Sequence, residues 1–257
     1  MEDPALPTPN SIVRALIILT IKARRHRPFR RIWRKQSGLF HIFGVCIKVR
    51  HDGDLNEAHA LQLVSRQTAI PVPKLHYAFT HHGTSYIVTQ HIDGIMAATR
   101  WPFRSKESQA RILDQLQSMI QELRSVKPPA GVGVSSVAGG PIYDCRLPRT
   151  SHWGPFPTVR DFHQALIDPV DMNTEYAWEP ERSDISQLVQ FYREAEEKVV
   201  LTHGDLSSLN ILVRGDDVVA IVDWETAGWL PEYWEYSCTL PKQQEVETIR
   251  RKYFGDF

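Results

Sequence analysis

Two carboxylates and one carboxamide stand at spacings that suit a metal ion and a phosphate group. Asn210 follows Asp205 by five residues, and Asp223 ends an apolar run further along the chain. Magnesium takes oxygen ligands and is often held by one or two protein groups together with phosphate oxygens. Transfer of a phosphoryl group also needs a carboxylate that orients the attacking hydroxyl and accepts its proton. The three side chains therefore predict a site for a magnesium–phosphate complex, provided that the chain brings them together.

Short apolar segments predict strands that would bring these side chains to one end of a sheet. The predicted strands are residues 199–201, 211–213 and 218–222, with a turn at residues 215–217. The first strand leads into a loop that begins at His203 and contains Asp205. The other two form a hairpin that begins after Asn210 and ends at Asp223. Asn210 and Asp223 should thus lie at the same end of the sheet, beside Asp205.

The order of these residues is itself a recognisable pattern. His203, Asp205 and Asn210 form H-x-D-x-x-x-x-N, which a strand-terminal Asp223 follows. A kinase catalytic loop and its metal-binding Asp have the same order. Taken singly, each residue has an ordinary structural explanation, because Asp and Asn form turns and caps and a histidine can be a satisfied core residue. All four together, with the hairpin between them, favour phosphoryl transfer.

The segment from residue 201 to 236 resembles a known family. HGDLSSLNILV and IVDWETAGWLPEYWEY are similar to the aminoglycoside phosphotransferase / choline kinase family, and most of all to its fungal branch. The resemblance implies an α+β, two-lobed, protein-kinase-like fold with a small β-rich N-lobe and a larger, mainly helical C-lobe. We expect a basic helical extension at residues 1–28, the N-lobe at 29–90 and the C-lobe at 91–257.

The resemblance also implies an activity and a set of roles. The γ-phosphate of ATP would move to a hydroxyl of a small molecule, with Mg²⁺ as cofactor. Asp205 would orient the hydroxyl and take its proton, and His203 would support the loop by hydrogen bonding. Asn210 and Asp223 would hold Mg²⁺. The partners are then a nucleotide and a small-molecule acceptor, whose identity the sequence leaves open, as it does the oligomeric state and the choice of ATP or GTP.

The N-terminal part offers candidates for nucleotide binding. Lys48 lies between two β-branched residues, and in the family such a lysine binds the α- and β-phosphates. Glu57 lies in the first turn of a helix predicted from Asp54 to Val64, with Asp54 as its N-cap, and could hold Lys48. The segment from Gln90 through Ile92 resembles the hinge between the lobes, whose backbone groups bind adenine in the family. Lys48 alone would otherwise be an ordinary surface lysine of a strand.

Two departures from the family pattern bear on activity. The loop that covers the phosphates should be rich in glycine, but only Gly38 and Gly44 precede Lys48. The fungal branch usually has Pro-Arg before the Asn, where this chain has Ser208-Leu209. The first departure puts the phosphate clamp in doubt, and the second concerns acceptor choice or loop rigidity.

Composition narrows the class of protein. The 257 residues contain 42% hydrophobic and 23% charged residues, as is ordinary for a globular protein. The net charge is zero, so no overall electrostatic field favours binding to nucleic acid or to a membrane. The three cysteines are far apart and form no C-x-x-C motif, so a cytoplasmic location is expected. The apolar run at residues 12–21 is too short to cross a bilayer, and we expect a helix there that Ser11 caps.

Other segments have more than one interpretation. The basic stretch 22–35 is a contact for an anionic surface or partner, or simply a solvated face. The acidic region 144–184 either lines the acceptor site or is exposed surface. Trp234 and Glu235 either pack beneath the loop or line the acceptor pocket. Further helices are predicted at residues 105–126, after Thr158, after Asp184 and at 242–254.

Three hypotheses of function follow. The first is the small-molecule O-phosphotransferase described above. The second is a catalytically weak or inactive kinase-like module for binding or scaffolding, which the poor glycine loop and the basic N-terminal stretch motivate. A protein kinase is the least favoured, because D-W-E replaces D-F-G and no A-P-E-like segment follows Asp223.

Overall fold

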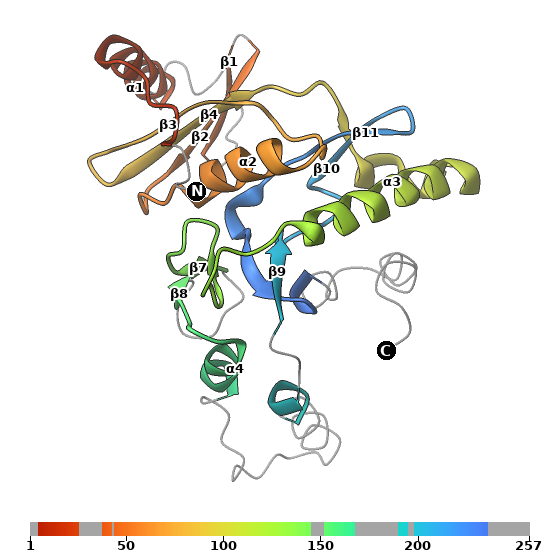
Figure 1. Ribbon diagram of the computed structural model, residues 1–257. Coiled ribbons are helices and arrows are strands. Elements are labelled where there is room, and N and C mark those ends of the chain that lie inside the picture. The colour runs from red at the N-terminus through yellow and green to blue at the C-terminus, as the bar shows by residue number, and fades with distance from the viewer. Residues whose placement is uncertain are drawn as a thin grey trace, which may run out of the picture. The chain divides into compact units, whose positions relative to one another are not determined.

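The computed structural model describes residues 5–25, 38–42, 44–144, 152–167, 190–194 and 198–235. The chain divides into two compact units, Met1–Leu116 with Ser208–Trp224, and Gln117–Ser207 with Glu225–Phe257 (Figure 1). The hairpin that carries Asn210 and Asp223 thus clusters with the N-terminal unit. The predicted lobe boundaries at residues 29 and 91 stay predictions. The helix predicted at 242–254, the start of the one after Asp184 and most of the basic stretch lie outside the described residues.

A four-stranded antiparallel sheet forms the centre of the first unit. Its strands are β1 (Leu39–Ile42), β2 (Val45–Arg50), β3 (Leu75–His81) and β4 (Thr84–Gln90), in the order β1-β2-β4-β3. Successive side chains of a strand point to opposite faces. Ile47 and Val49 are therefore buried on one face, and Lys48 lies on the other.

The turn between β3 and β4 is short. His81 pairs with Thr84, so the turn contains only His82 and Gly83. Both have positive φ, 47° and 71°. Two such residues match the right-handed twist of the flanking strands, which is why short hairpins favour this turn.

Helix α1 (Ser11–Arg25) packs on the sheet face that carries Ile47 and Val49, where Ile18 and Ile21 join the same core cluster. The backbone N–H of Val13 donates to Asn10 Oδ1 at 2.9 Å. Asn10, rather than Ser11, is thus the side chain that caps the helix.

Helix α2 (Asn56–Gln67) contacts the opposite face, where Ala58 packs with Ala78 and Ile87. Leu55 occupies the N-cap position, and Asp54 precedes it. The Asp54 carboxylate still accepts the N–H of Asn56 at 2.8 Å. The prediction of Asp54 as N-cap was therefore wrong by one position, although its carboxylate satisfies one of the free N–H groups at this end of the helix.

The predicted hairpin is formed by β10 (Ile211–Arg214) and β11 (Asp217–Ile221), and β10 also pairs with β5 (Ile95–Met96). A short 3₁₀ segment, η2 (Ala97–Phe103), leads from β5 to helix α3 (Lys106–Ser125). The strand β11 ends at Ile221, not next to Asp223 as predicted. Val222 N–H still donates to the Asn210 carbonyl at 2.9 Å, but Asp223 has a φ of 66° and leaves the strand direction.

The second unit is built around a small antiparallel sheet in the order β6-β12-β9. Its strands are β6 (Ser135–Ser136), β9 (Val199–Thr202) and β12 (Gly228–Pro231). Other elements in this part of the chain are the strand pair β7 (Ile142–Tyr143) and β8 (His152–Trp153), helix α4 (Val159–Ile167) and the 3₁₀ turn η3 (Trp224–Thr226). Thr158 caps α4 as predicted, since its Oγ1 accepts the Asp161 N–H at 3.0 Å. Phe162, Leu230 and Trp234 share one buried cluster.

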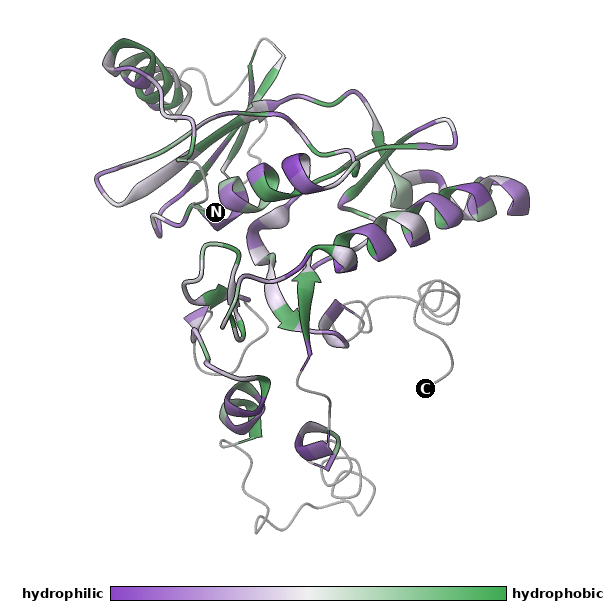
Figure 2. Ribbon diagram, viewed as in Figure 1, coloured by the Kyte–Doolittle hydropathy of each residue, from purple (hydrophilic) through white to green (hydrophobic). Residues whose placement is uncertain are grey.

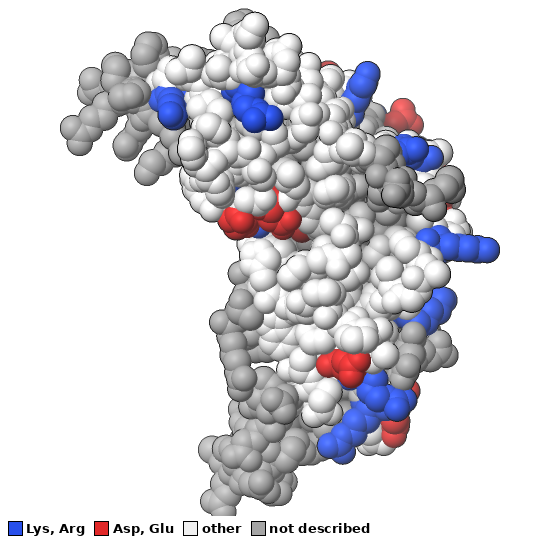
Figure 3. All heavy atoms as spheres, turned by 60° about the vertical axis from the view of Figure 1, so that its left-hand side comes forward, with Lys and Arg blue, Asp and Glu red and all other residues white. Residues whose placement is uncertain are grey.

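Both signs of charge occur on the face of the described residues that Figure 3 draws. Lys and Arg form small groups there, and Asp and Glu form others. Figure 2 shows that the strands are mostly apolar, whereas α3 carries many hydrophilic residues. Among the helices in the described ranges, none is both long and apolar enough to cross a bilayer.

Candidate active site

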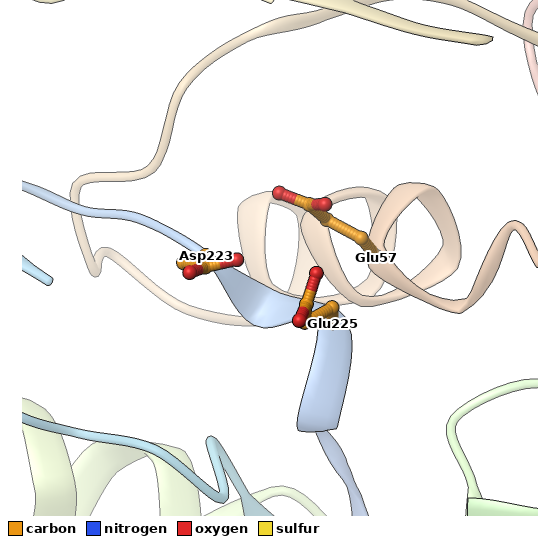
Figure 4. A group of neighbouring side chains, drawn as sticks. All are labelled: Glu57, Asp223 and Glu225. Atoms are coloured by element: carbon orange, nitrogen blue, oxygen red, sulfur yellow. The ribbon is translucent and has the colours of Figure 1, made fainter. Parts of the chain in front are cut away.

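Lys48 lies between two carboxylates in the first unit. Its Nζ is 2.8 Å from Glu57 Oε2 and 2.5 Å from Asp223 Oδ1. Oxygens of the two carboxylates lie within 4.8 Å of one another. Figure 4 shows Glu57 projecting from α2 and Asp223 from the segment after β11, with Glu225 two residues further along the chain. The ammonium group thus offsets the repulsion between two neighbouring acids.

The elements explain why these three side chains meet. Lys48 sits on β2, a strand with neighbours on both sides, and projects from the face that α2 contacts. Glu57 lies in the first turn of α2 and is almost fully buried. The sequence predicted this pair. It did not predict the contact of Lys48 with Asp223, since the two residues are far apart in the chain and no local pattern connects them.

Asp223 is held in an unusual backbone conformation by its neighbour. Its φ of 66° is in the left-handed region, which costs a residue with a Cβ about 1–2 kcal/mol. The next residue, Trp224, is fully buried, and its indole Nε1 donates to the Ile221 carbonyl at 2.9 Å. The buried indole anchors the backbone on the C-terminal side of Asp223. Such strain is often found at functional sites.

Asn210 joins this group through its backbone. Its carbonyl accepts the N–H of Val222, the residue before Asp223, and its side chain is largely buried. Asn210 therefore directly precedes the hairpin and Asp223 follows it, as predicted. An amide oxygen and a carboxylate are hard oxygen donors, so this pair fits a magnesium ion in its chemistry.

Asp205 and His203 belong to the second unit, in the loop after β9. His203 is fully buried, and its Nδ1 accepts the backbone N–H of Asp205 at 3.2 Å. The His203 carbonyl accepts the Thr226 hydroxyl at 2.9 Å. The imidazole thus contacts the loop in the way that the sequence suggested for a supporting residue.

Glu235, at the end of the described residues, binds this loop from beneath, which is one of the two interpretations that the sequence allowed. Its buried carboxylate accepts three backbone N–H groups: those of His203 at 2.8 Å, Gly204 at 3.1 Å and Leu206 at 3.0 Å. A carboxylate that binds three loop amides fixes the backbone on both sides of Asp205. Of the two interpretations of Glu235, the contacts support the one in which it packs beneath the loop. No sequence spacing signals the contact, because about thirty residues separate its members.

Gly204 shows how tightly the loop is packed. Its φ is 82°, and a Cβ at this position would lie 2.5 Å from the Thr226 carbonyl oxygen. Only glycine fits such a close approach.

The hinge candidates follow the central strand of the sheet. Gln90 is the last residue of β4, and its N–H donates to the Lys74 carbonyl at 2.9 Å. The next N–H, from His91, donates to the Gly44 carbonyl at 3.0 Å, and Ile92 is partly buried. Gln90 and Ile92 thus lie in the same unit as Lys48, on the strand that pairs with β2. Their contact with adenine stays a prediction.

Comparison with solved structures defines the class of fold. A thermostable mutant of aminoglycoside phosphotransferase APH(4)-Ia aligns with a TM-score of 0.60 at 16% identity, over 84% of this chain and 72% of that one. The streptomycin–ATP–APH(2")-IIa complex aligns with a TM-score of 0.53 at 11% identity, over 99% and 83%. The fold is therefore α+β and protein-kinase-like, as predicted.

Residues 51–254 match the model of the Phosphotransferase enzyme family, APH, and the chain belongs to this family. The aminoglycoside 3'-phosphotransferase of Niallia circulans is 23% identical over 187 residues, which cover 73% of this chain. The chain spans about three fifths of the length of that relative, 62%. The match begins after Lys48, so the assignment of that lysine depends on the structure.

Proposed function

We propose that this chain is an ATP- and Mg²⁺-dependent phosphotransferase that moves the γ-phosphate to a hydroxyl of a small molecule. The observation that carries the proposal is Lys48, which one acid from α2 and one from the end of the β10–β11 hairpin hold in place. Membership of the phosphotransferase family supports it independently. The neighbour that was solved with ATP and streptomycin binds both a nucleotide and a small molecule that carries hydroxyl groups.

The roles follow from the chemistry of each side chain. The Lys48 ammonium binds the α- and β-phosphates, and Glu57 keeps it in position. The backbone from Gln90 through Ile92 binds the adenine. Asn210 and Asp223 hold Mg²⁺, which when bound neutralises charge on the phosphate oxygens.

The second unit supplies the groups for the acceptor in this proposal. The Asp205 carboxylate accepts a hydrogen bond from the acceptor hydroxyl and takes its proton as the oxygen attacks the γ-phosphorus. The bond from that phosphorus to the bridging oxygen of ADP breaks, so the products are a phosphate monoester and ADP. His203 keeps the backbone of Asp205 in place through its Nδ1.

The Lys48–Asp223 contact suggests what nucleotide binding must change. In this proposal the Lys48 ammonium gains the phosphates as partners and Asp223 gains a metal ion, so each has a new partner of opposite charge to compete with their mutual contact. We expect Mg²⁺ and ATP together to separate Lys48 from Asp223, while the contact with Glu57 remains.

Thermal unfolding with and without nucleotide tests the proposal. ATP with Mg²⁺ should stabilise the wild type by about 2.7 kcal/mol at a concentration about 100-fold above the dissociation constant. Asp223→Ala should lose the part of the shift that depends on Mg²⁺. Asp217→Ala, an exposed acid of the same hairpin, is the matched control and should behave as the wild type. Release of ADP in a screen of hydroxyl-bearing small molecules would then identify the acceptor.

The alternative is a kinase-like module that binds or scaffolds without turnover. It is motivated by the scarcity of glycine in the segment before Lys48, where only Gly38 and Gly44 are available to a loop that would cover the phosphates. The absence of any Mg²⁺-dependent shift in the wild type would support this module and refute the phosphotransferase. Placement in the fungal branch of the family and a cytoplasmic location remain part of the proposal.

A further inference from the structure

Helix α1 is apolar on two opposite sides. Ile18 and Ile21 are 8% and 2% exposed and pack on the sheet. On the other side Ile12, Leu16 and Leu19 are 72%, 58% and 61% exposed. Their spacing of four and then three residues places them in one stripe along the helix. A surface helix normally has one apolar stripe, which faces the core, so a second stripe that faces outward is expected to have an occupant.

The apolar surface continues from this stripe into a groove. Leu16 and Ile17 of α1 form one wall, and Ile42, Val45 and Tyr77 of the sheet form the other. The groove has a volume of about 400 Å³. The exposed stripe is therefore the edge of a wider apolar region, not a set of isolated side chains.

Positive charge is concentrated in the same part of the sequence. Nine of the 30 Lys and Arg residues fall within residues 4–47, a range that contains no Asp or Glu. Lys22 lies one turn after Leu19 in α1. The pKa of His81, at the end of β3, is held below its ordinary value by desolvation and then by His82, Lys22 and Arg14. Positive charge is thus concentrated in α1 and in the residues that follow it in the sequence.

We propose that the outward stripe of α1, formed by Ile12, Leu16 and Leu19, docks the protein on the surface of an anionic phospholipid bilayer. Apolar side chains of an amphipathic helix enter the boundary between headgroups and acyl chains, and neighbouring Lys and Arg bind anionic headgroups. A second copy of the chain is a poorer occupant, since it would bring two basic regions together. Nucleic acid would use the charge but would leave the stripe exposed.

Flotation with liposomes tests this on the full chain. One set contains phosphatidylcholine alone, and the other contains about one third phosphatidylserine. The wild type should float with the second set and not with the first, and salt should weaken the binding. Leu16→Gln/Leu19→Gln should reduce binding to anionic liposomes at least about tenfold. Phe103→Gln, which removes an apolar side chain that is 87% exposed in η2, is the matched control and should bind as the wild type.

The possible results of these experiments distinguish a membrane from a second copy of the chain and from nucleic acid. Equal flotation with the two lipid sets, or no flotation, would overturn the proposal. So would a double variant that floats as well as the wild type, provided that circular dichroism shows it to be folded. A dimer of the wild type that the double variant loses would assign the stripe to a second copy, and salt-sensitive binding of RNA unaffected by the double variant would assign the charge to nucleic acid. Arg30→Gln/Arg31→Gln should weaken lipid binding without changing ADP release.

Discussion

The two carboxylates for which we propose roles, Asp205 and Asp223, lie in different surroundings. Asp223 is paired with a lysine and held by a strained backbone, whereas Asp205 is positioned through the amides around it. A metal ligand must keep its negative charge and its place, and a general base must be free to accept a proton. The two sites thus need different kinds of support.

Asp205→Asn should separate chemistry from binding. The amide has nearly the same shape but cannot accept the hydroxyl proton, so ADP release should fall at least about a hundredfold. The Mg²⁺-dependent thermal shift with ATP should persist, because the nucleotide groups lie on Lys48, Asn210 and Asp223. Turnover equal to that of the wild type would show that Asp205 is not the base.

Glu235→Gln should loosen the loop that carries Asp205. The carboxylate oxygens accept three N–H groups, and the amide would turn an NH₂ group toward at least one of them. We expect a loss of roughly 1–3 kcal/mol in the free energy of unfolding, measured by urea denaturation.

Glu232→Gln is the control for this experiment. Glu232 is a partly exposed acid nearby in the sequence that pairs with Lys198 at 3.0 Å, and a surface pair of this kind contributes roughly 0–1 kcal/mol. Equal losses in the two variants would mean that the buried carboxylate has no special role in stabilising the loop.

At the level of elements, glycines with the same backbone conformation should respond differently to substitution. Gly204→Ala places a Cβ 2.5 Å from the Thr226 carbonyl oxygen, whereas Gly215→Ala at the tip of the β10–β11 hairpin meets open space. Both pay about 1–2 kcal/mol for the positive φ. Gly204→Ala should cost clearly more and lower the thermal midpoint further. Similar thermal midpoints for the two variants would show that the loop accommodates a Cβ at residue 204 without further loss of stability.

The tip of the β10–β11 hairpin is bound to α3 and the segment before it by one carboxylate. Asp216 accepts hydrogen bonds from Ser108 at 2.5 Å and from Arg104 at 3.1 Å, and it also pairs with Arg111. The Ser108 hydroxyl first, and then the Arg111 guanidinium, hold the pKa of Asp216 below its ordinary value of 3.8. The hairpin that presents Asn210 and Asp223 is thereby fixed at its far end.

The lowered pKa of Asp216 predicts how the free energy of unfolding changes with pH. A depressed pKa means that the ionised Asp216 stabilises the folded state at pH values above the unfolded pKa, and that this stabilisation is lost as the pH falls through the folded pKa. Asp216→Asn should therefore be less stable than the wild type at neutral pH, with a difference that shrinks below about pH 4. Asp217→Asn is the control. A difference that grows on acidification would contradict the assignment.

At the level of the whole molecule, the two units do not follow the order of the chain. The first contains residues 1–116 and then the segment 208–224, so the hairpin belongs to the N-terminal unit although it follows part of the second unit in the chain. The groups proposed for the nucleotide and the metal ion belong to one unit, and Asp205 belongs to the other. The net charge of zero likewise combines a basic N-terminal range with a remainder rich in acids. Neither the interleaving of the two units nor the uneven distribution of charge can be inferred from the overall composition or net charge.

The sequence by itself determined the family and the class of fold, through its resemblance to known phosphotransferases. The strands around residues 199–221 and helix α3 followed from hydrophobic periodicity, because this is a local property that a few neighbouring residues express. The Lys48–Glu57 pair was expected from the family resemblance together with the local helix pattern. The errors were equally local and small: Asn10 rather than Ser11 caps α1, and β11 ends before Asp223.

Only the tertiary structure decided how distant residues pair. Lys48 meets Asp223, Glu235 binds the amides around Asp205, and Asp216 binds Arg104 and Arg111, although no spacing in the sequence connects the members of any of these sets. It also decided that the stripe of Ile12, Leu16 and Leu19 faces outward, since an apolar helix has no preferred side until it packs. Such contacts form only when the fold brings together elements that are far apart in the sequence. The local pattern of residues does not specify which distant elements will meet.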